Sequence, residues 1–248
     1  MSAQTSPNNA VVGTAFRVWL PVVLAFLGVL GMIFVGQNIR QLNFLSISPM
    51  AEVNNRFSYQ VITLGMAFAY LLIVYRLRPE AFRRFARTGE LNAPTSPVRW
   101  LGISSKETWR SVGLNFALVT TLATGTFLYF NFIQPKNILL AALVGWLPVA
   151  AALAVINAFV EEALTRFGVV VGLFGVIPNG VIYVISALVF GLPHYFGTPG
   201  GVVGTLMAGF LGWLLARSVV DTRGMFWAWF IHFLLDVIIF MTLLSVLA

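Results

Sequence analysis

Long apolar runs, separated by short polar segments, make up most of the chain. The runs fall near 18–36, 59–75, 111–133, 139–177 (interrupted), 181–194, 201–219 and 225–247. Most of them approach the length of about 20 apolar residues that an α-helix needs to cross a bilayer. The pattern therefore predicts an all-α, polytopic transmembrane helix bundle of about seven helices, within a range of six to eight.

The 139–177 run is too long for one crossing, because a continuous helix of that length would extend about 58 Å. Pro148 is the expected break, since proline is tolerated at the start of a helix and disfavoured inside it. We predict a helix from Pro148 to Ile177, a turn at 178–180, and a return along 181–194. This hairpin is expected to place Glu161 and His194 at similar depth.

Composition supports the membrane assignment. Of the 248 residues, 59% are hydrophobic and only 9% are charged, against roughly 25% charged in an ordinary soluble domain. We expect residues 1–248 to form a single transmembrane domain without a second, soluble domain. The chain has no cysteine, which excludes disulfides, thiol catalysis and cysteine-ligated zinc.

Basic residues concentrate in the segment 76–110, which holds eight of the 15 lysines and arginines: Arg76, Arg78, Arg83, Arg84, Arg87, Arg99, Lys106 and Arg110. The positive-inside rule places this basic loop, and with it the N-terminus, in the cytoplasm. The net charge of +7 thus reflects topology and contact with anionic lipid headgroups, and nucleic acid is excluded as a partner. Within the loop, Pro79 to Thr88 and Ser104 to Arg110 are candidate amphipathic surface helices.

Carboxylates and an arginine interrupt the apolar run at Glu161, Glu162 and Arg166. Ionisable groups at membrane depth are costly and mark functional sites by default. Glu162 and Arg166 are four residues apart and share a helix face, so they form the natural ion pair. Glu161 projects about 100° away from that face and is left free to act. A charged helix end at the cytoplasmic surface is the alternative interpretation of the same residues.

The two histidines of the chain also lie in apolar segments. Pro193 is expected to end or kink the helix just before His194, leaving the imidazole beside irregular backbone that can hold water. His232 and Asp236 are four residues apart on the last predicted helix, where they share a face and could hydrogen-bond. Each motif alone suits a structural role in helix packing. Their concentration in three apolar segments, together with Glu161, favours one shared functional cluster.

Small residues recur every fourth position on the predicted helix 201–219, at Gly200, Gly204, Ala208, Gly212 and Ala216. Such a stripe is typical of close helix packing in membranes. It would also allow a dimer, and the oligomeric state stays open.

The three motifs, EExxxR at 161–166, FxxxH at 190–194 (Phe190 to His194) and HxxxD at 232–236, occur in an order that resembles the CAAX protease and bacteriocin-processing (CPBP, or Abi) family of intramembrane proteases. That family includes the type II CAAX prenyl endopeptidases. The resemblance covers roughly 145–240, the expected catalytic core. Two features depart from the family pattern. Thr165 and Phe167 flank Arg166, and Asp236 stands where the prenyl endopeptidases have asparagine.

The resemblance implies a role for each motif. Glu161 would be the general base that activates water, assisted by His194, while His232 and Asp236 would stabilise or protonate the oxyanion. Glu162, Arg166 and Phe190 would support them. An ionised aspartate would repel an oxyanion, so Asp236 must be protonated, orient His232, or help to hold a metal.

A metal cofactor is an open question at this stage. The resemblance implies a metalloprotease, and the candidate shell of Glu161, His194 and His232 suits catalytic zinc, which takes three protein ligands and keeps an open position. A metal-free glutamate protease would use the same residues. The sequence does not separate the two mechanisms.

The expected activity is that of an endopeptidase in a prokaryotic inner (plasma) membrane. Its substrate would be a membrane-associated protein or peptide, such as a prenylated CAAX-type or a bacteriocin-like one. The alternatives are a non-catalytic immunity or partner-binding protein and a proton-coupled transporter that uses the same ionisable cluster. The sequence identifies neither the substrate nor whether it is prenylated.

Overall fold

The computed structural model describes residues 7–197 and 199–247, and all named elements in these residues are helical. The α-helices are α1 (Pro7–Leu42), α2 (Ala51–Leu77), α3 (Pro79–Phe85), α4 (Trp109–Leu128), α5 (Leu140–Gly145), α6 (Leu147–Glu162), α7 (Gly168–Leu173), α8 (Asn179–Gly191), α9 (Gly201–Thr222) and α10 (Phe226–Leu247). Shorter π or 3-10 turns are η1 (Arg99–Leu101), η2 (Tyr129–Ile133), η3 (Gln134–Lys136), η4 (Ala163–Phe167) and η5 (Leu192–Phe196).

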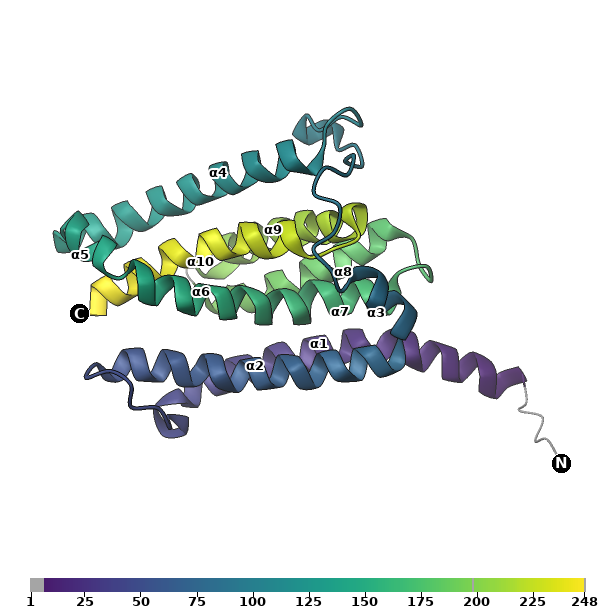
Figure 1. Cartoon of the computed structure of the whole chain (residues 1–248), viewed down its shortest axis with the longest axis horizontal. Coiled ribbons are helices and arrows are strands. Elements are labelled where there is room, and N and C mark those ends of the chain that lie inside the picture. The colour runs from purple at the N-terminus through teal and green to yellow at the C-terminus, as the bar shows by residue number, and fades with distance from the viewer. Residues whose placement is uncertain (1–6, 198, 248) are drawn as a thin grey trace.

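Seven helical segments in the described residues are long and apolar enough to cross a membrane, which confirms the predicted all-α bundle. Their bounds are Ala15–Leu42, Ala51–Leu77, Trp109–Lys136, Leu147–Leu173, Asn179–Phe196, Gly201–Thr222 and Phe226–Leu247. Figure 1 shows these helices running roughly along one common axis, as a membrane bundle requires.

The long apolar run breaks near Pro148, as predicted. The short helix α5 ends at Gly145, and α6 begins at Leu147 with the proline in its first turn, where proline's missing N–H is tolerated. A π-helical turn, η4, joins α6 to α7. The expected helical arm to Ile177 is wrong at its end, because the helix stops at Leu173 and Phe174 takes a non-helical conformation.

The α6–η4–α7 segment occupies the centre of the bundle. Every residue from Glu162 to Leu173 is buried, and the main apolar core gathers around it. Helix α10 packs along α6, α9 packs along α8, and α1 and α2 pair on the opposite side (Figure 1). The motif-bearing helices therefore lie next to one another.

The small-residue stripe of α9 packs against α8, as predicted. A β-carbon added at Gly212 would come within 3.2 Å of the Ala187 α-carbon. On an adjacent face, one added at Gly191 would come within 2.8 Å of the Gly209 α-carbon. Glycine is needed at these points because the two backbones approach too closely for a larger side chain.

The basic loop folds back over one end of the bundle (Figure 1). The Trp227 indole N–H donates to the Leu91 carbonyl, and the Trp109 indole N–H donates to Asp221. Of the two expected surface helices in this loop, α3 covers Pro79–Phe85. The second expectation is wrong, because 104–108 is non-helical and α4 begins at Trp109.

Candidate active site

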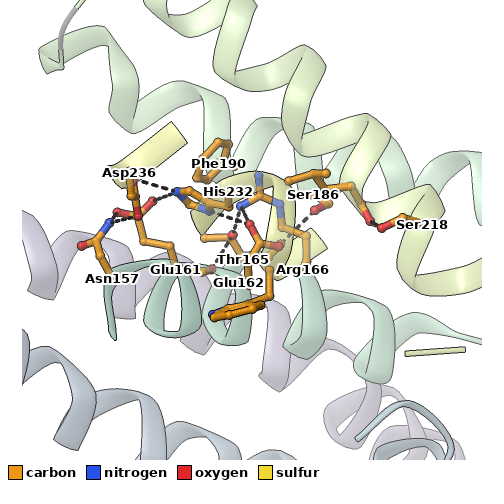
Figure 2. Close-up of polar contacts among 12 residues, drawn as sticks. Asn157, Glu161, Glu162, Thr165, Arg166, Ser186, Phe190, Ser218, His232 and Asp236 are labelled. Carbon is orange, nitrogen blue, oxygen red and sulfur yellow. Dashed lines mark hydrogen bonds and ion pairs between the residues drawn. The ribbon is translucent and has the colours of Figure 1, made fainter. Parts of the chain in front are cut away.

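Helix α6 with its π-helical turn η4, helix α10 and the α8–η5 segment bring the predicted site residues together. Figure 2 shows those on α6, η4, α8 and α10. Glu161 and Glu162 end α6, directly before the π-helical turn that carries Arg166. His232 and Asp236 lie one turn apart on α10. His194 lies in η5, which continues α8.

Glu162 and Arg166 form a fully buried ion pair. Their Oε1 and Nη1 atoms are 3.0 Å apart, and the side chains are 1% and 0% exposed, which confirms the pairing expected from helical spacing. The guanidinium carbon lies 3.5 Å from the centre of the Phe190 ring, so an aromatic face covers the cation. Because both charges have lost their water, their mutual attraction offsets part of the cost of burying them.

The hydrogen-bond partner of His232 is Glu162 of this ion pair, and not Asp236. Its Nδ1 lies 2.7 Å from Glu162 Oε1, and because that carboxylate is held as an acceptor by Arg166, the Nδ1–H donates to it. Its Nε2 lies 3.6 Å from both Glu161 Oε2 and Asp236 Oδ1. The hydrogen bond expected between His232 and Asp236 is therefore absent at this distance, and Glu162 orients the ring.

Asn157 links the two remaining carboxylates. Its amide nitrogen donates to Glu161 Oε1 and to Asp236 Oδ2, at 3.0 Å in each case. The side-chain amide of Gln60 on α2 in turn donates to the side-chain oxygen of Asn157 (Oδ1) at 3.1 Å. This chain fixes the amide orientation and directs both of its protons toward the acids. Figure 2 shows Asn157 beside Glu161 and Asp236.

The π-helical turn after Glu162 is supported by side-chain hydrogen bonds. The Thr165 hydroxyl donates to the Glu161 carbonyl at 2.7 Å and accepts from Arg166 Nη1 at 2.7 Å. The Ser186 hydroxyl of α8 donates to the Thr165 carbonyl at 2.9 Å. Single π turns inside α-helices occur frequently at functional sites, and here the turn fixes the position of Glu161 relative to Arg166.

His194 is oriented by the backbone of its own motif. Its Nδ1 donates to the Phe190 carbonyl at 2.7 Å, because a carbonyl oxygen can only accept, and Nε2 then carries the free lone pair. The Phe190 ring centre lies 4.5 Å from that of His194 and 5.5 Å from that of His232. Phe190 therefore packs between both histidines and Arg166.

Two cavities meet at these residues. One, of about 260 Å³, is lined by Glu161, His194, His232 and Asp236 together with α4 and α9 side chains. The other, of about 440 Å³, is lined by Glu161 and His194 and by α1 and α2. Glu161 is 21% exposed, whereas Glu162 is 1% exposed. The structure thus brings all four predicted catalytic residues to a shared cavity and leaves Glu161 the more accessible of the two glutamates.

The match with known proteins falls on this part of the chain. Residues 143–238 match the family model described as type II CAAX prenyl endopeptidase Rce1-like. This segment is therefore similar to the type II CAAX prenyl endopeptidases. The match supports a CAAX-type intramembrane endopeptidase in general terms. No curated protein and no solved structure matches the chain.

The candidate metal shell of Glu161, His194 and His232 is not gathered around one point in the described residues. Within residues 7–197 and 199–247, no three histidine, aspartate or glutamate side chains are placed to hold one ion. The Nδ1 atoms of His232 and His194 both contact protein acceptors, which leaves Nε2 as the available nitrogen of each ring.

Sequence reasoning missed three polar residues of the site: Asn157, Gln60 and Thr165. Asn157 could have been predicted, because it lies four residues before Glu161 in an apolar run and so shares its helix face. Thr165 lies inside the EExxxR motif, where a hydroxyl can bond to the carbonyl one turn earlier. Gln60 carries no such signal, because its partner is 97 residues away.

Proposed function

We propose that the chain is an intramembrane endopeptidase in which Glu161 activates water for attack on a peptide bond of a membrane-associated substrate. The observation that carries the proposal is the placement of Glu161. It is the partly exposed carboxylate of a buried polar cluster, and it lies where two cavities meet. The family match supports the peptidase class.

The proposed reaction uses Glu161 as the general base. Asn157 holds Oε1, so Oε2 is the oxygen directed toward His232 and the water. Glu161 takes one proton from water as the water oxygen bonds to the carbonyl carbon. The carbon–nitrogen bond then breaks, and the proton passes to the leaving nitrogen, so the products are a carboxylic acid and an amine. His194 Nε2 lies on the same cavity as a second acceptor for the water.

His232 and Asp236 stand on the oxyanion side in this proposal. The Nε2 of His232 faces both carboxylates, 3.6 Å from each, while Glu162 fixes the other ring nitrogen. Asn157 is already bonded to Asp236, and a proton on the other Asp236 oxygen would turn a repulsive group into a donor. The pair therefore suits a hydrogen bond to the developing negative charge.

The proposal is tested by following the oxygen atom. Purified protein in proteoliposomes is given a pool of internally quenched decapeptides, with and without a farnesylated CAAX end, in water labelled with heavy oxygen. We expect two fragments, with the label in the new carboxylate of the N-terminal fragment, and none with Glu161→Ala. Folded protein that cleaves no peptide, or fragments without the label, would contradict hydrolysis.

A further inference from the structure

The two ends of the bundle differ strongly in charge. Eleven of the 15 basic residues gather at the end formed by the basic loop and the α7–α8 and α9–α10 turns: Arg17, Arg76, Arg78, Arg83, Arg84, Arg87, Arg99, Lys106, Arg110, Arg217 and Arg223. Only Arg40, Arg56 and Lys136 lie toward the other end, and Arg166 is in the middle. The positive-inside rule places the basic end in the cytoplasm.

Both cavities at Glu161 occupy the half of the bundle away from that basic end. The 440 Å³ cavity is walled by the second half of α1 and the start of α2, including Gly36 and Glu52, and by Phe240 near the end of α10. The 260 Å³ cavity is walled by the second half of α4 and the start of α9. Figure 1 shows the α1–α2 connection and the C-terminal end of α10 at the end opposite the basic loop.

At the basic end, backbone hydrogen bonds hold together the segments that cover the bundle. The Glu90 amide donates to the Thr222 carbonyl and the Met225 amide donates to the Arg87 carbonyl, which ties the basic loop to the α9–α10 turn. A third cavity, of about 500 Å³, does lie in this half. It reaches Glu162, is lined almost entirely by apolar side chains, and includes neither Glu161 nor His194.

The wall of the 440 Å³ cavity suits a polypeptide better than a lipid tail. Helix α2 contributes Glu52, Asn55, Arg56, Tyr59 and Gln60 to it. Arg56 is paired with Glu52 at 2.7 Å, and its buried Nε has no hydrogen-bond partner in the described residues. An extended peptide brings unpaired amide and carbonyl groups into the membrane, and these need such donors and acceptors.

We propose that the substrate reaches Glu161 from the non-cytoplasmic face of the membrane, as a polypeptide segment that enters the cavity between α1, α2 and the end of α8. This inference rests on the proposed peptidase function for the identity of the occupant. The access route itself rests on the charge difference between the ends and on the position of the cavities.

The absence of cysteine from the chain makes the route directly measurable with single-cysteine variants and a membrane-impermeant maleimide on intact cells. Val189→Cys places a thiol on the 440 Å³ cavity. Leu188→Cys is its matched control, because the neighbouring side chain is 51% exposed and lines neither cavity at Glu161. Arg83→Cys reports on the basic end.

We expect Val189→Cys to react in intact cells about tenfold faster than Leu188→Cys, because only a hydrated thiol ionises to the reactive thiolate. Arg83→Cys should react only after permeabilisation. Labelling of Val189→Cys that requires permeabilisation, or that fails even then, would overturn the access route.

Cleavage in sided vesicles separates this inference from the proposed function. With the quenched decapeptide pool added outside, we expect cleavage by right-side-out vesicles and little by inside-out vesicles. Cleavage by inside-out vesicles alone would overturn the access route and leave the peptidase function standing. If neither preparation cleaves while Val189→Cys labels as expected, the peptidase function fails and the route is supported.

Discussion

At the scale of single residues, Asn157 is the contact on which two of the acids that line the site cavity, Glu161 and Asp236, depend. It gives one amide proton to Glu161 and the other to Asp236, so each acid has a hydrogen-bond donor in the protein interior. Without that amide, Glu161 and Asp236 would face each other with less compensation in a site of low polarity. Asn157 therefore acts as a positioning residue for both acids.

Replacing Asn157 tests this role. We expect Asn157→Leu to lower kcat by about 10- to 100-fold, the range for residues that hold a functional side chain in place through a hydrogen bond. The change in KM should be smaller. Peptide cleavage in proteoliposomes measures both constants. Asn131→Leu is the matched control, because this exposed asparagine bonds only to a carbonyl of its own helix. Equal rates for the two variants would remove Asn157 from the mechanism.

Two Glu–Arg ion pairs in the described residues have the same helical spacing, which permits a controlled test of burial. Arg166→Met leaves Glu162 buried without its partner and should cost about 3–5 kcal/mol of unfolding free energy. Arg56→Met breaks a pair with side chains 22% and 33% exposed and should cost less than about 1 kcal/mol. Thermal unfolding in detergent compares the two. A similar loss for both variants would argue against a special role for the buried pair.

At the scale of elements, the π-helical turn between α6 and α7 sets the register of the site. It follows Glu162 directly, and the next residue, Gly168, packs against Tyr70 of α2. The Tyr70 hydroxyl donates to the Pro21 carbonyl of α1, so α1, α2 and α7 meet at this glycine. A β-carbon at this position would overlap the tyrosine ring.

We therefore expect Gly168→Ala to destabilise the fold by about 1–3 kcal/mol through overpacking. Gly65→Ala on α2 is the control, since an added β-carbon there meets nothing within 4 Å, and its stability should be unchanged or slightly higher. Chemical or thermal unfolding of the detergent-solubilised protein gives the comparison. A Gly168→Ala protein as stable as Gly65→Ala would show that the three helices separate easily.

Local patterns predicted the elements well and the long-range contacts poorly. Apolar run length predicted the seven crossings, Pro148 and Pro193 the helix interruptions, and i,i+4 spacing the Glu162–Arg166 pair. The same spacing rule paired His232 with Asp236, but its partner is Glu162, 70 residues away. Contacts of this kind depend on how the helices pack and on how each is rotated about its axis. The π turn changes that rotation for the residues after Glu162. The local spacing of apolar and polar residues does not contain this information.

At the scale of the whole molecule, the bundle divides into a cationic end closed by the basic loop and an opposite half that contains the cavities at Glu161. The central α6–η4–α7 segment joins the two and carries the charged groups at its middle. Burial of its Glu162–Leu173 part explains why the ionisable cluster tolerates membrane depth. Its charges face one another and the cavities instead of lipid.

Metal removal tests the chemistry of the assembled protein. Because the described residues offer no three-ligand cluster, we expect protein purified without metal and incubated with a strong chelator to keep its peptidase activity. Peptide cleavage before and after chelation is the measurement. Activity lost on chelation and restored by added zinc would favour the zinc-dependent mechanism and require rearrangement of His194 and His232.

The most direct test of the central claim compares two glutamates that line the same cavity, Glu161 and Glu52. Glu161→Gln keeps the size and the Asn157 contact region but removes the base, so we expect kcat to fall by at least about 100-fold with the thermal stability retained. Glu52→Gln should keep kcat close to the wild-type value and change only KM, because Glu52 lies on the wall of the cavity and is not the base. A Glu161→Gln protein that turns over peptide as fast as Glu52→Gln would contradict the claim that Glu161 activates the attacking water.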